Sequence, residues 1–239
     1  MAADPYEHVA PFYDAINEEP TERIALVLSL LESYAPTATS VLELGCGTGA
    51  VLAGLGSGWE LQGVDASAAM LEVARRRLPS ARFSLDDITT VDLQRTFDVV
   101  LCVCDTINHV TSLEGWRAVV ERAAAHLEVG GLFIMDYNTR GRFLDLDEST
   151  PWAHEVDDHT LVMSLDFADP LATWHVRLFE RVDRDYFRHH ETDIVELSVP
   201  TSEVLAIVAA AFDIVETTDT EGGVANDVSH RGVLIARRR

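Results

Sequence analysis

The sequence contains no lysine and no long apolar run, and it has only three cysteines. All 18 of its basic residues are arginines, against 40 acidic residues, and the formal net charge over 239 residues is −22. A surface of this sign repels phosphate backbones and anionic lipids. We therefore expect neither nucleic acid nor a membrane as a partner. No stretch approaches the roughly 20 apolar residues that a membrane-spanning helix needs.

The few cysteines and the acidic start of the chain bear on location. Cys46 lies in a glycine-rich stretch, and Cys102 and Cys104 are two positions apart on one expected strand. This number and spacing indicate neither a disulfide framework nor a zinc site, so we expect reduced thiols and no metal. The opening residues, MAADPYEHVAPFYD, lack the basic start and apolar core of a secretion signal. We expect a cytoplasmic protein, and the missing lysine is typical of GC-rich bacterial coding.

Apolar residues recur at helical spacing between short apolar runs over the first 137 residues. Residues 21–35 predict a core-facing helix that Pro36 ends. Ser67 is placed as the N-cap of a second helix, and Thr111 with Glu114 has the spacing of a capping box at a third. Strands are expected at 40–45, 60–65, 81–85, 97–103 and 130–137, and a last helix and two closing strands at 201–212, 213–219 and 231–237. The pattern predicts a doubly wound α/β core.

About sixty residues, 138–200, interrupt this rhythm and are too long for a plain connection. Alternating stretches at 159–167, 173–182 and 191–199 predict three to four antiparallel strands. We expect residues 1–137 and 201–239 to form the cofactor-binding core and 138–200 to form an inserted antiparallel β lid that contributes to the substrate pocket. Because an exposed sheet edge can pair between subunits, a homodimer is one expectation.

The stretch VLELGCGTGA, residues 41–50, predicts a nucleoside site. Gly45, Gly47 and Gly49 follow the first strand, where ligands bind in open α/β sheets. Asp65, twenty positions after Gly45, lies where an acid binds a ribose. This pattern alone permits a nicotinamide-dependent oxidoreductase. Glu43 argues against it, because a carboxylate before the first glycine opposes a pyrophosphate but suits a ligand with a cationic group.

S-adenosylmethionine is a phosphate-free nucleoside with a sulfonium and an ammonium group. VLELGCGTG, with GVDAS behind it, resembles the first two motifs of the class I S-adenosylmethionine-dependent methyltransferases, and LDDI resembles the third. The resemblance implies a seven-stranded sheet with an antiparallel last strand, and S-adenosylmethionine as cofactor. It also implies that the cofactor is bound by Tyr13, Glu43, Gly45, Cys46, Gly47, Gly49, Asp65, Ala66, Asp87, Ile88, Cys102 and Val103.

The resemblance assigns different residues to the methionine, ribose and adenine parts of the cofactor. Glu43 and the glycine loop would line the methionine half, and Asp65 would bind both ribose hydroxyls. Asp87 would accept the adenine amino group, although Asp86 competes for this role, and Ile88 would pack on the ring. Cys102 and Val103 would contribute backbone under the methionine moiety.

YEHVAPFYD, CDTINHV and MDYNT resemble small-molecule methyltransferases with an inserted lid, similar to the sugar-amine N-methyltransferases of antibiotic pathways. We therefore expect methyl transfer to nitrogen or oxygen of a small metabolite, in secondary metabolism. A hydroxyl acceptor would need a general base, and His109 is the first choice because histidine is the side-chain type whose unperturbed pKa lies nearest neutrality. The candidate catalytic residues are His109, Asp105 and Tyr137, and the candidate substrate-binding residues are Asn108, Asp136 and Asn138.

Other interpretations remain open at this stage. Asn108 and His109 are ordinary turn residues, Asp136 and Asn138 can tie down a loop, and Tyr13 can be a core aromatic. For the whole protein, the alternatives are an NAD(P)-dependent oxidoreductase and a non-catalytic, cofactor-binding regulatory protein with this fold.

Overall fold

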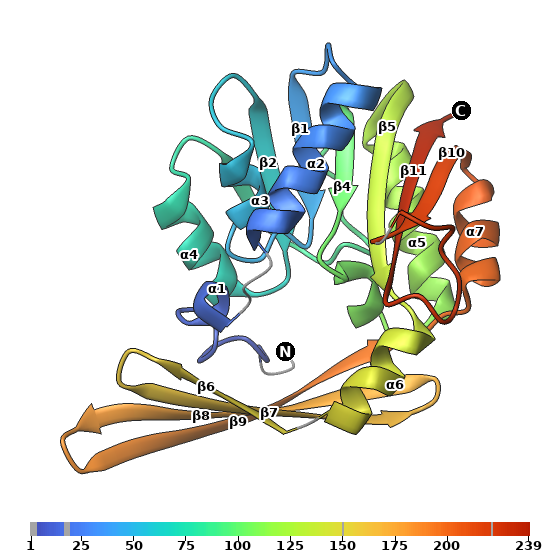
Figure 1. Cartoon of the computed structure of the whole chain (residues 1–239). Helices are drawn as coiled ribbons and strands as arrows, with labels where there is room; N and C mark the ends of the chain where they lie inside the picture. The colour runs from blue at the N-terminus through green and yellow to red at the C-terminus, as the bar shows by residue number, and fades with distance from the viewer. Residues whose placement is uncertain (1–3, 17–19, 150, 221) are drawn as a thin grey trace.

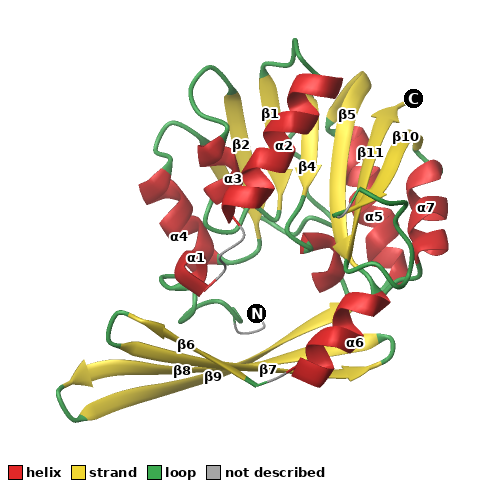
Figure 2. Cartoon of the chain, in the orientation of Figure 1, coloured by secondary structure: helices red, strands yellow, loops and turns green. Residues whose placement is uncertain are grey.

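The computed structural model describes residues 4–16, 20–149, 151–220 and 222–239. Seven strands form one sheet in the order β10-β11-β5-β4-β1-β2-β3 (Figures 1 and 2). Only β11 runs antiparallel to its neighbours in this sheet. The strands are β1 Ser40–Leu44, β2 Glu60–Asp65, β3 Arg82–Leu85, β4 Phe97–Cys102, β5 Leu127–Asn138, β10 Phe212–Asp219 and β11 Arg231–Arg238. The expected α/β fold class is confirmed, and the strand order reverses between β1 and β4, where such sheets bind ligands.

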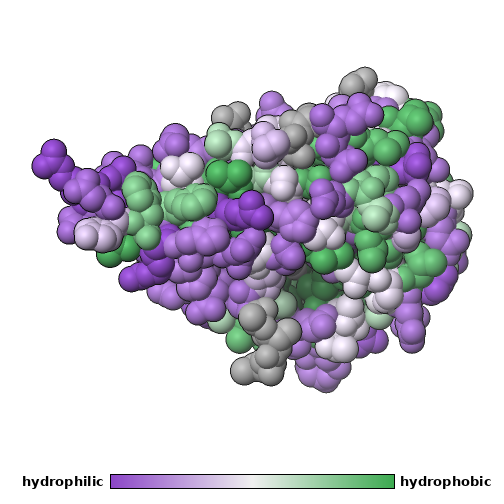
Figure 3. Space-filling view, turned by 90° about the horizontal axis from the view of Figure 1, so that it is seen from below, coloured by the Kyte–Doolittle hydropathy of each residue, from purple (hydrophilic) through white to green (hydrophobic). Residues whose placement is uncertain are grey.

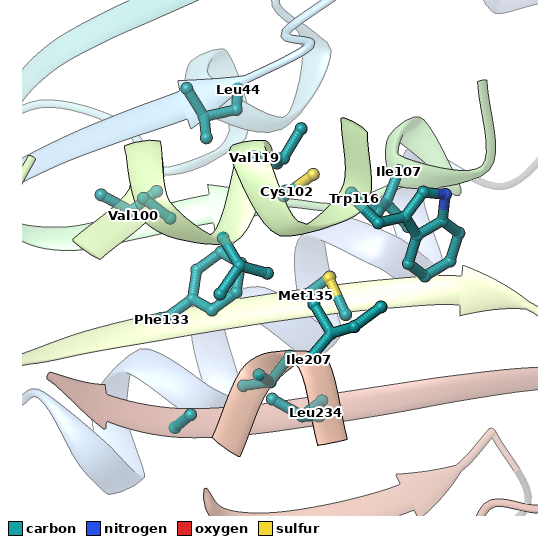
Figure 4. Close-up of a cluster of buried hydrophobic side chains, with 14 of the residues drawn as sticks. Leu44, Val100, Cys102, Ile107, Trp116, Val119, Phe133, Met135, Ile207 and Leu234 are labelled. Atoms are coloured by element: carbon teal, nitrogen blue, oxygen red, sulfur yellow. The ribbon is translucent and has the colours of Figure 1, made fainter. Parts of the chain in front are cut away.

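Helices cover both faces of this sheet. The helices are α1 Tyr13–Ile16, α2 Pro20–Tyr34, α3 Ala50–Gly54, α4 Ala68–Arg77, α5 Leu113–Ala125, α6 Arg140–Ser149 and α7 Thr201–Ala209. One hydrophobic cluster packs α2 and α3 against the sheet, and a second packs α5 and α7 against the opposite face. Successive residues of β4 alternate between the two, so Val100 and Cys102 lie under α5 (Figure 4). Among the described residues, no helix is long and apolar enough to span a membrane.

Of the two helix N-caps predicted from the sequence, one is confirmed and the other is wrong. Ser67 caps α4, since its Oγ accepts a hydrogen bond from the Met70 N–H at 3.1 Å. The expected capping box at Thr111 is wrong: α5 is capped one residue later by Ser112, whose Oγ accepts from the Gly115 N–H at 3.1 Å. Ser112 has an extended backbone, and its hydroxyl accepts a hydrogen bond from a backbone N–H of the first turn. The Glu114 side chain is therefore not needed for this cap.

A second, four-stranded antiparallel sheet in the order β6-β7-β8-β9 lies across the carboxyl edge of the parallel strands (Figure 1). Its strands are β6 Trp152–Val156, β7 His159–Ala168, β8 Leu171–Asp183 and β9 Tyr186–Leu197. The expected β lid is therefore present. The helix α6 precedes it and was not expected; Phe143 and Leu146 of α6 pack on Leu165 and Ala172 of the lid.

Candidate functional site

A cavity of about 470 Å³ lies between the carboxyl ends of the parallel strands and the lid. Small-ligand sites commonly measure roughly 300–1,000 Å³. Figure 3 views the molecule from below and shows a hollow with hydrophobic residues at its bottom. The residues expected from the sequence that line the cavity are Tyr13, Glu43, Gly45, Cys46, Gly47, Asp65, Ala66, Asp87, Ile88, Asp105, His109 and Asn138.

The three glycines of the loop after β1 have positive φ values of 71°, 50° and 71° and serve different purposes. A Cβ on Gly45 would overlap the Thr106 side chain, and one on Gly49 would lie 3.1 Å from the Ala74 Cβ of α4. Gly47 lines the cavity and has no described atom within 4 Å of an added Cβ. Gly47 is therefore the position where a ligand can approach a bare backbone. Gly49 does not line the cavity, and its expected ligand contact is replaced by packing on α4.

Glu43 is a buried carboxylate in the cavity wall, 2% exposed. Its Oε2 has no hydrogen-bond partner among the described residues. Burial first, and then the charge of Asp65, raise the pKa of Glu43 well above its usual value, and the backbone N–H of Leu52 offsets this only in part. A cationic ligand group would stabilise the ionised form, whereas a pyrophosphate would be repelled.

Asp65 ends β2 and has both carboxylate oxygens fixed. Oδ2 accepts a hydrogen bond from the Gly47 N–H at 2.7 Å, and Oδ1 accepts from the Ser67 N–H at 2.8 Å. Burial raises the pKa of Asp65, and these two bonds act against it. Each oxygen retains a further lone pair, so the carboxylate can accept two more donors, as a ribose diol requires. Ala66 lines the cavity beside it.

The turn after β3 distinguishes the two competing aspartates. Asp87 and Ile88 line the cavity, and Asp86 does not. Asp87 Oδ1 accepts from the backbone N–H and the hydroxyl of Thr89 at 2.8 and 2.7 Å. This fixes the carboxylate in a turn from which its other oxygen can accept a hydrogen bond from a base, as the third motif implies.

The N-terminal segment closes one side of the cavity. Tyr6 and Tyr13 pack edge to face with ring centroids 5.9 Å apart, and both line the cavity. Burial raises the pKa of each phenol well above its usual value. Asp14 accepts a hydrogen bond from the Thr48 hydroxyl at 2.6 Å and forms an ion pair with Arg77. The segment is thereby bonded to the loop that follows β1.

Three titratable groups meet at one end of the cavity, where Asp105 and His109 line it and Glu196 lies behind them. Atoms of Asp105, His109 and Glu196 lie within 4.8 Å of one another. Asp105 and His109 flank the 3₁₀ turn Thr106–His109 after β4, and Glu196 comes from β9 of the lid. Glu196 is 2% exposed and accepts hydrogen bonds from Trp174 Nε1 at 2.6 Å and Asn138 Nδ2 at 3.1 Å.

A buried ionic network supports this cluster from behind. Asp136, 1% exposed, pairs with Arg23 at 3.0 Å and with Arg231 at 3.1 Å. Arg231 also pairs with Asp105 at 2.6 Å. Burial acts to raise the pKa of Asp105, but Arg231, followed by His109 and Arg23, holds it below its usual value. Asp136 does not line the cavity, so the expected substrate contact is not made. Its carboxylate instead accepts hydrogen bonds from the backbone N–H groups of residues 104 and 105 and orients their turn.

Of the two asparagines expected to bind the substrate, one lines the cavity and the other does not. Asn108 is fully buried and outside the cavity lining; its amide bonds to the backbone N–H and carbonyl of Asn138 and to the carbonyl of Leu197. The expected substrate role of Asn108 is therefore corrected to a structural one. Asn138 lines the cavity, and its buried Oδ1 has no hydrogen-bond partner among the described residues.

Three further expected residues do not reach the cavity. Tyr137 is fully buried and belongs to the α5/α7 hydrophobic cluster, because it shares its strand face with Phe133 and Met135. Its expected catalytic role is corrected to packing. Cys102 lies in the same cluster (Figure 4) and Val103 in the cluster on the α2 face, and neither lines the cavity.

Sequence reasoning missed several lining residues. They are Tyr6, Asp14, Thr48, Val51, Ala50, Met70, Thr89, Cys104, Thr106, Val110, Arg142, Leu146, Trp174 and Arg231. Tyr6 lies in the quoted N-terminal stretch and could have been found there. Trp174, Glu196 and Arg231 carry no local signal, because the packing of the lid and of the antiparallel β11 brings them to the site.

The site residues fit S-adenosylmethionine. The unpartnered Glu43 oxygen matches a cationic group, the open backbone at Gly47 permits close approach, and Asp65 can accept a diol. Of the described lining residues only Arg142 and Arg231 are arginines, and Arg231 is paired with Asp105.

Comparisons with known proteins agree with this geometry. The family described as Methyltransferase domain matches residues 41–131. A dTDP-4-amino-2,3,4,6-tetradeoxy-D-glucose N,N-dimethyltransferase from Saccharopolyspora spinosa is 33% identical over 132 residues, which is 53% of each chain. A dTDP-3-amino-3,6-dideoxy-alpha-D-glucopyranose N,N-dimethyltransferase from Streptomyces fradiae is 31% identical over 56% of this chain and 54% of its own. The chain spans about half the length of the curated relatives it matches.

Solved structures extend the likeness to nearly the whole chain. The sugar N-methyltransferase KedS8 from Streptoalloteichus sp. superposes with a TM-score of 0.80 at 26% identity, over 95% of this chain and 92% of that one. An S-adenosylmethionine-dependent methyltransferase from Clostridium acetobutylicum gives a TM-score of 0.85 at 19% identity over 98% of both chains, a likeness of fold.

Proposed function

This chain belongs to the class I S-adenosylmethionine-dependent methyltransferases, and from that premise we propose that it methylates nitrogen or oxygen of a small metabolite, with an amine nitrogen favoured. The buried, unpartnered oxygen of Glu43 beside the glycine loop carries the proposal. When bound, S-adenosylmethionine supplies a methyl group already activated by its sulfonium. The protein then has to hold the acceptor atom about 3 Å from that carbon in a dry cavity.

Each part of the cofactor has a residue suited to it. Glu43 and the backbone at Gly47 would hold the methionine half, and Asp65 the ribose. Asp87 and Ile88 would hold the adenine. The nicotinamide alternative is not supported, because the relatives that the chain matches are methyltransferases.

The acceptor end of the cavity favours an amine. At this end Asp105 and the free Oδ1 of Asn138 line the cavity as acceptors, with the Glu196 carboxylate behind them and Arg231 paired to Asp105. The named activities of the relatives, N-methylation of amino sugars, agree with this chemistry. For a hydroxyl acceptor, His109 is the group placed to take the proton.

We also infer a cytoplasmic location and a homodimer. The three free cysteines support a reducing compartment, and the open edges of the lid sheet at β6 and β9 support pairing between subunits. The bacterial relatives support a bacterial source. The net charge of −22 supports small molecules rather than nucleic acid as partners.

Calorimetry with S-adenosylmethionine and S-adenosylhomocysteine tests the cofactor site. We expect both to bind, and Asp65→Ala to weaken binding by about 2 kcal/mol, roughly thirty-fold, through lost charge-assisted hydrogen bonds. Glu72→Ala, at an exposed glutamate of α4 outside the cavity, should leave the affinity unchanged. Absence of binding at millimolar ligand would refute the proposal. Mass spectrometry of a metabolite extract incubated with methyl-labelled cofactor would then identify the product.

A further inference from the structure

In the part of the chain that the structure describes, Glu196 has no arginine partner, and the basic group beside it is His109, within 4.8 Å. The buried network at the acceptor end contains three carboxylates, Asp105, Asp136 and Glu196, and two guanidinium groups, Arg23 and Arg231. The guanidinium groups contact Asp105 and Asp136. Among the described residues, Glu196 accepts hydrogen bonds only from the neutral groups of Trp174 and Asn138. Removing a carboxylate from water is costly unless it is paired.

Glu196 is not itself a lining residue of the cavity; its carboxylate lies directly behind residues that are. Its carboxylate lies within 4.8 Å of the reactive atoms of Asp105 and His109, which line the cavity, and its two donors, Trp174 and Asn138, line it as well. The free Oδ1 of Asn138 adds a second acceptor beside it. A ligand that meets these groups needs N–H donors and a positive charge.

Resting on the proposed function, we propose that Glu196 is the specificity-determining residue of the acceptor subsite: it binds the ammonium group of the methyl acceptor and removes one proton from it. In that step an N–H bond breaks, its electron pair stays on nitrogen as the lone pair, and an O–H bond forms at the Glu196 carboxylate. The ammonium becomes a neutral amine and the carboxylate a neutral acid.

The environment of Glu196 suits this exchange. Burial first, and then repulsion by Asp105, raise the pKa of Glu196, while His109 and the bonds from Asn138 and Trp174 act against the rise. A carboxylate with a raised pKa is a better proton acceptor for an ammonium than an ordinary one. Arg231, from β11, and Arg23, from α2, form ion pairs with the other carboxylates of the network.

Binding of matched amine and amide probes tests the proposal. Calorimetry on the S-adenosylhomocysteine-loaded protein would compare D-glucosamine, ethanolamine and tyramine with their N-acetyl forms. We expect at least one amine to bind, its acetamide to bind at least roughly ten-fold more weakly, and Glu196→Gln to abolish that preference. Glu191→Gln, at an exposed glutamate of the same strand paired with Arg177, is the control and should keep it.

The Glu196→Gln variant should retain the fold. The carbonyl oxygen of the introduced amide can still accept from Trp174, and the free Oδ1 of Asn138 can accept from its NH₂ group if the Asn138 side chain rotates. Unchanged affinity for S-adenosylhomocysteine and an unaltered melting temperature or a higher one would verify this. A wild-type protein without preference for the amines, or a Glu196→Gln variant that keeps it, would overturn the inference. If the wild-type protein does not bind S-adenosylhomocysteine at all, the proposed function is refuted instead.

Discussion

At the scale of single residues, Glu43 couples stability to cofactor binding. Because burial raises its pKa, the folded protein binds the Glu43 proton more tightly than the unfolded chain does. The cofactor-free protein therefore gains stability from this group as the pH falls from above the raised folded-state pKa towards the usual value for glutamate. At higher pH the full desolvation cost of the carboxylate remains.

We predict that Glu43→Gln stabilises the cofactor-free protein at pH 8 by about 1 kcal/mol, or roughly 2–4 °C in melting temperature, with a smaller gain at pH 5. The same variant should bind S-adenosylmethionine more weakly. Urea unfolding and calorimetry would measure the two effects. Glu60→Gln, which removes an exposed glutamate paired with Arg95, serves as the control and should give no gain. A destabilised Glu43→Gln at pH 8 would contradict the prediction.

Residue roles were predictable from the sequence where the chemistry is local to one loop. Glu43 and Asp65 lie in short motifs, and the structure places them at the cavity as expected. The catalytic role predicted for Tyr137 was wrong for a reason that the sequence does contain. Tyr137 follows Phe133 and Met135 at the strand period of two, which puts it on the face covered by α5 and α7. Glu196 could not be found, because its role depends on where the lid lies.

At the scale of elements, α4 links the cofactor loop to the N-terminal segment. Ser67 caps α4 and also donates a hydrogen bond from its hydroxyl to Asp4 at 2.7 Å, across 63 residues of sequence. Ser112 caps α5 on the other side of the sheet. The two serines form a matched pair with the same local function.

We predict that Ser67→Ala and Ser112→Ala each lower the free energy of unfolding by about 1 kcal/mol, the usual value of an N-cap. Only Ser67→Ala should also weaken S-adenosylmethionine binding, because it releases the segment that carries Tyr6 and Tyr13. Chemical unfolding and calorimetry on both variants would show this. An equal effect of the two substitutions on cofactor affinity would count against a closing role for the segment.

The core elements were predictable because their apolar periodicity is strong, whereas α6 was not. The start of α6 depends on a distant loop: the Gly141 N–H donates to the Asp227 carbonyl at 2.8 Å, and a Cβ on Gly141 would lie 2.7 Å from the Val228 carbonyl oxygen. Such contacts leave no trace in the local pattern of residues 140–149.

At the scale of the whole molecule, the acidic surface opposes the folded state. A net charge of −22 repels itself most strongly in the compact form. We predict that raising NaCl from about 0.01 M to 0.5 M, which shortens the Debye length from about 30 Å to below 8 Å, increases the melting temperature. Calorimetric scans in NaCl and KCl should give the same rise. A melting temperature that falls with salt would show that the ion pairs dominate.

The lid leaves the core after Asn138 and returns at Leu197, and one side chain, Asn108, bonds to the backbone at both points. Asn108, on the turn that follows β4, thus holds both ends of the insertion. On the proposed function, we expect a lid from a methyltransferase of the same fold, grafted between Asn138 and Leu197 with the Asn108 bonds intact, to change the acceptor. Because Val9 of the N-terminal segment packs on the lid, that segment would have to be exchanged together with it.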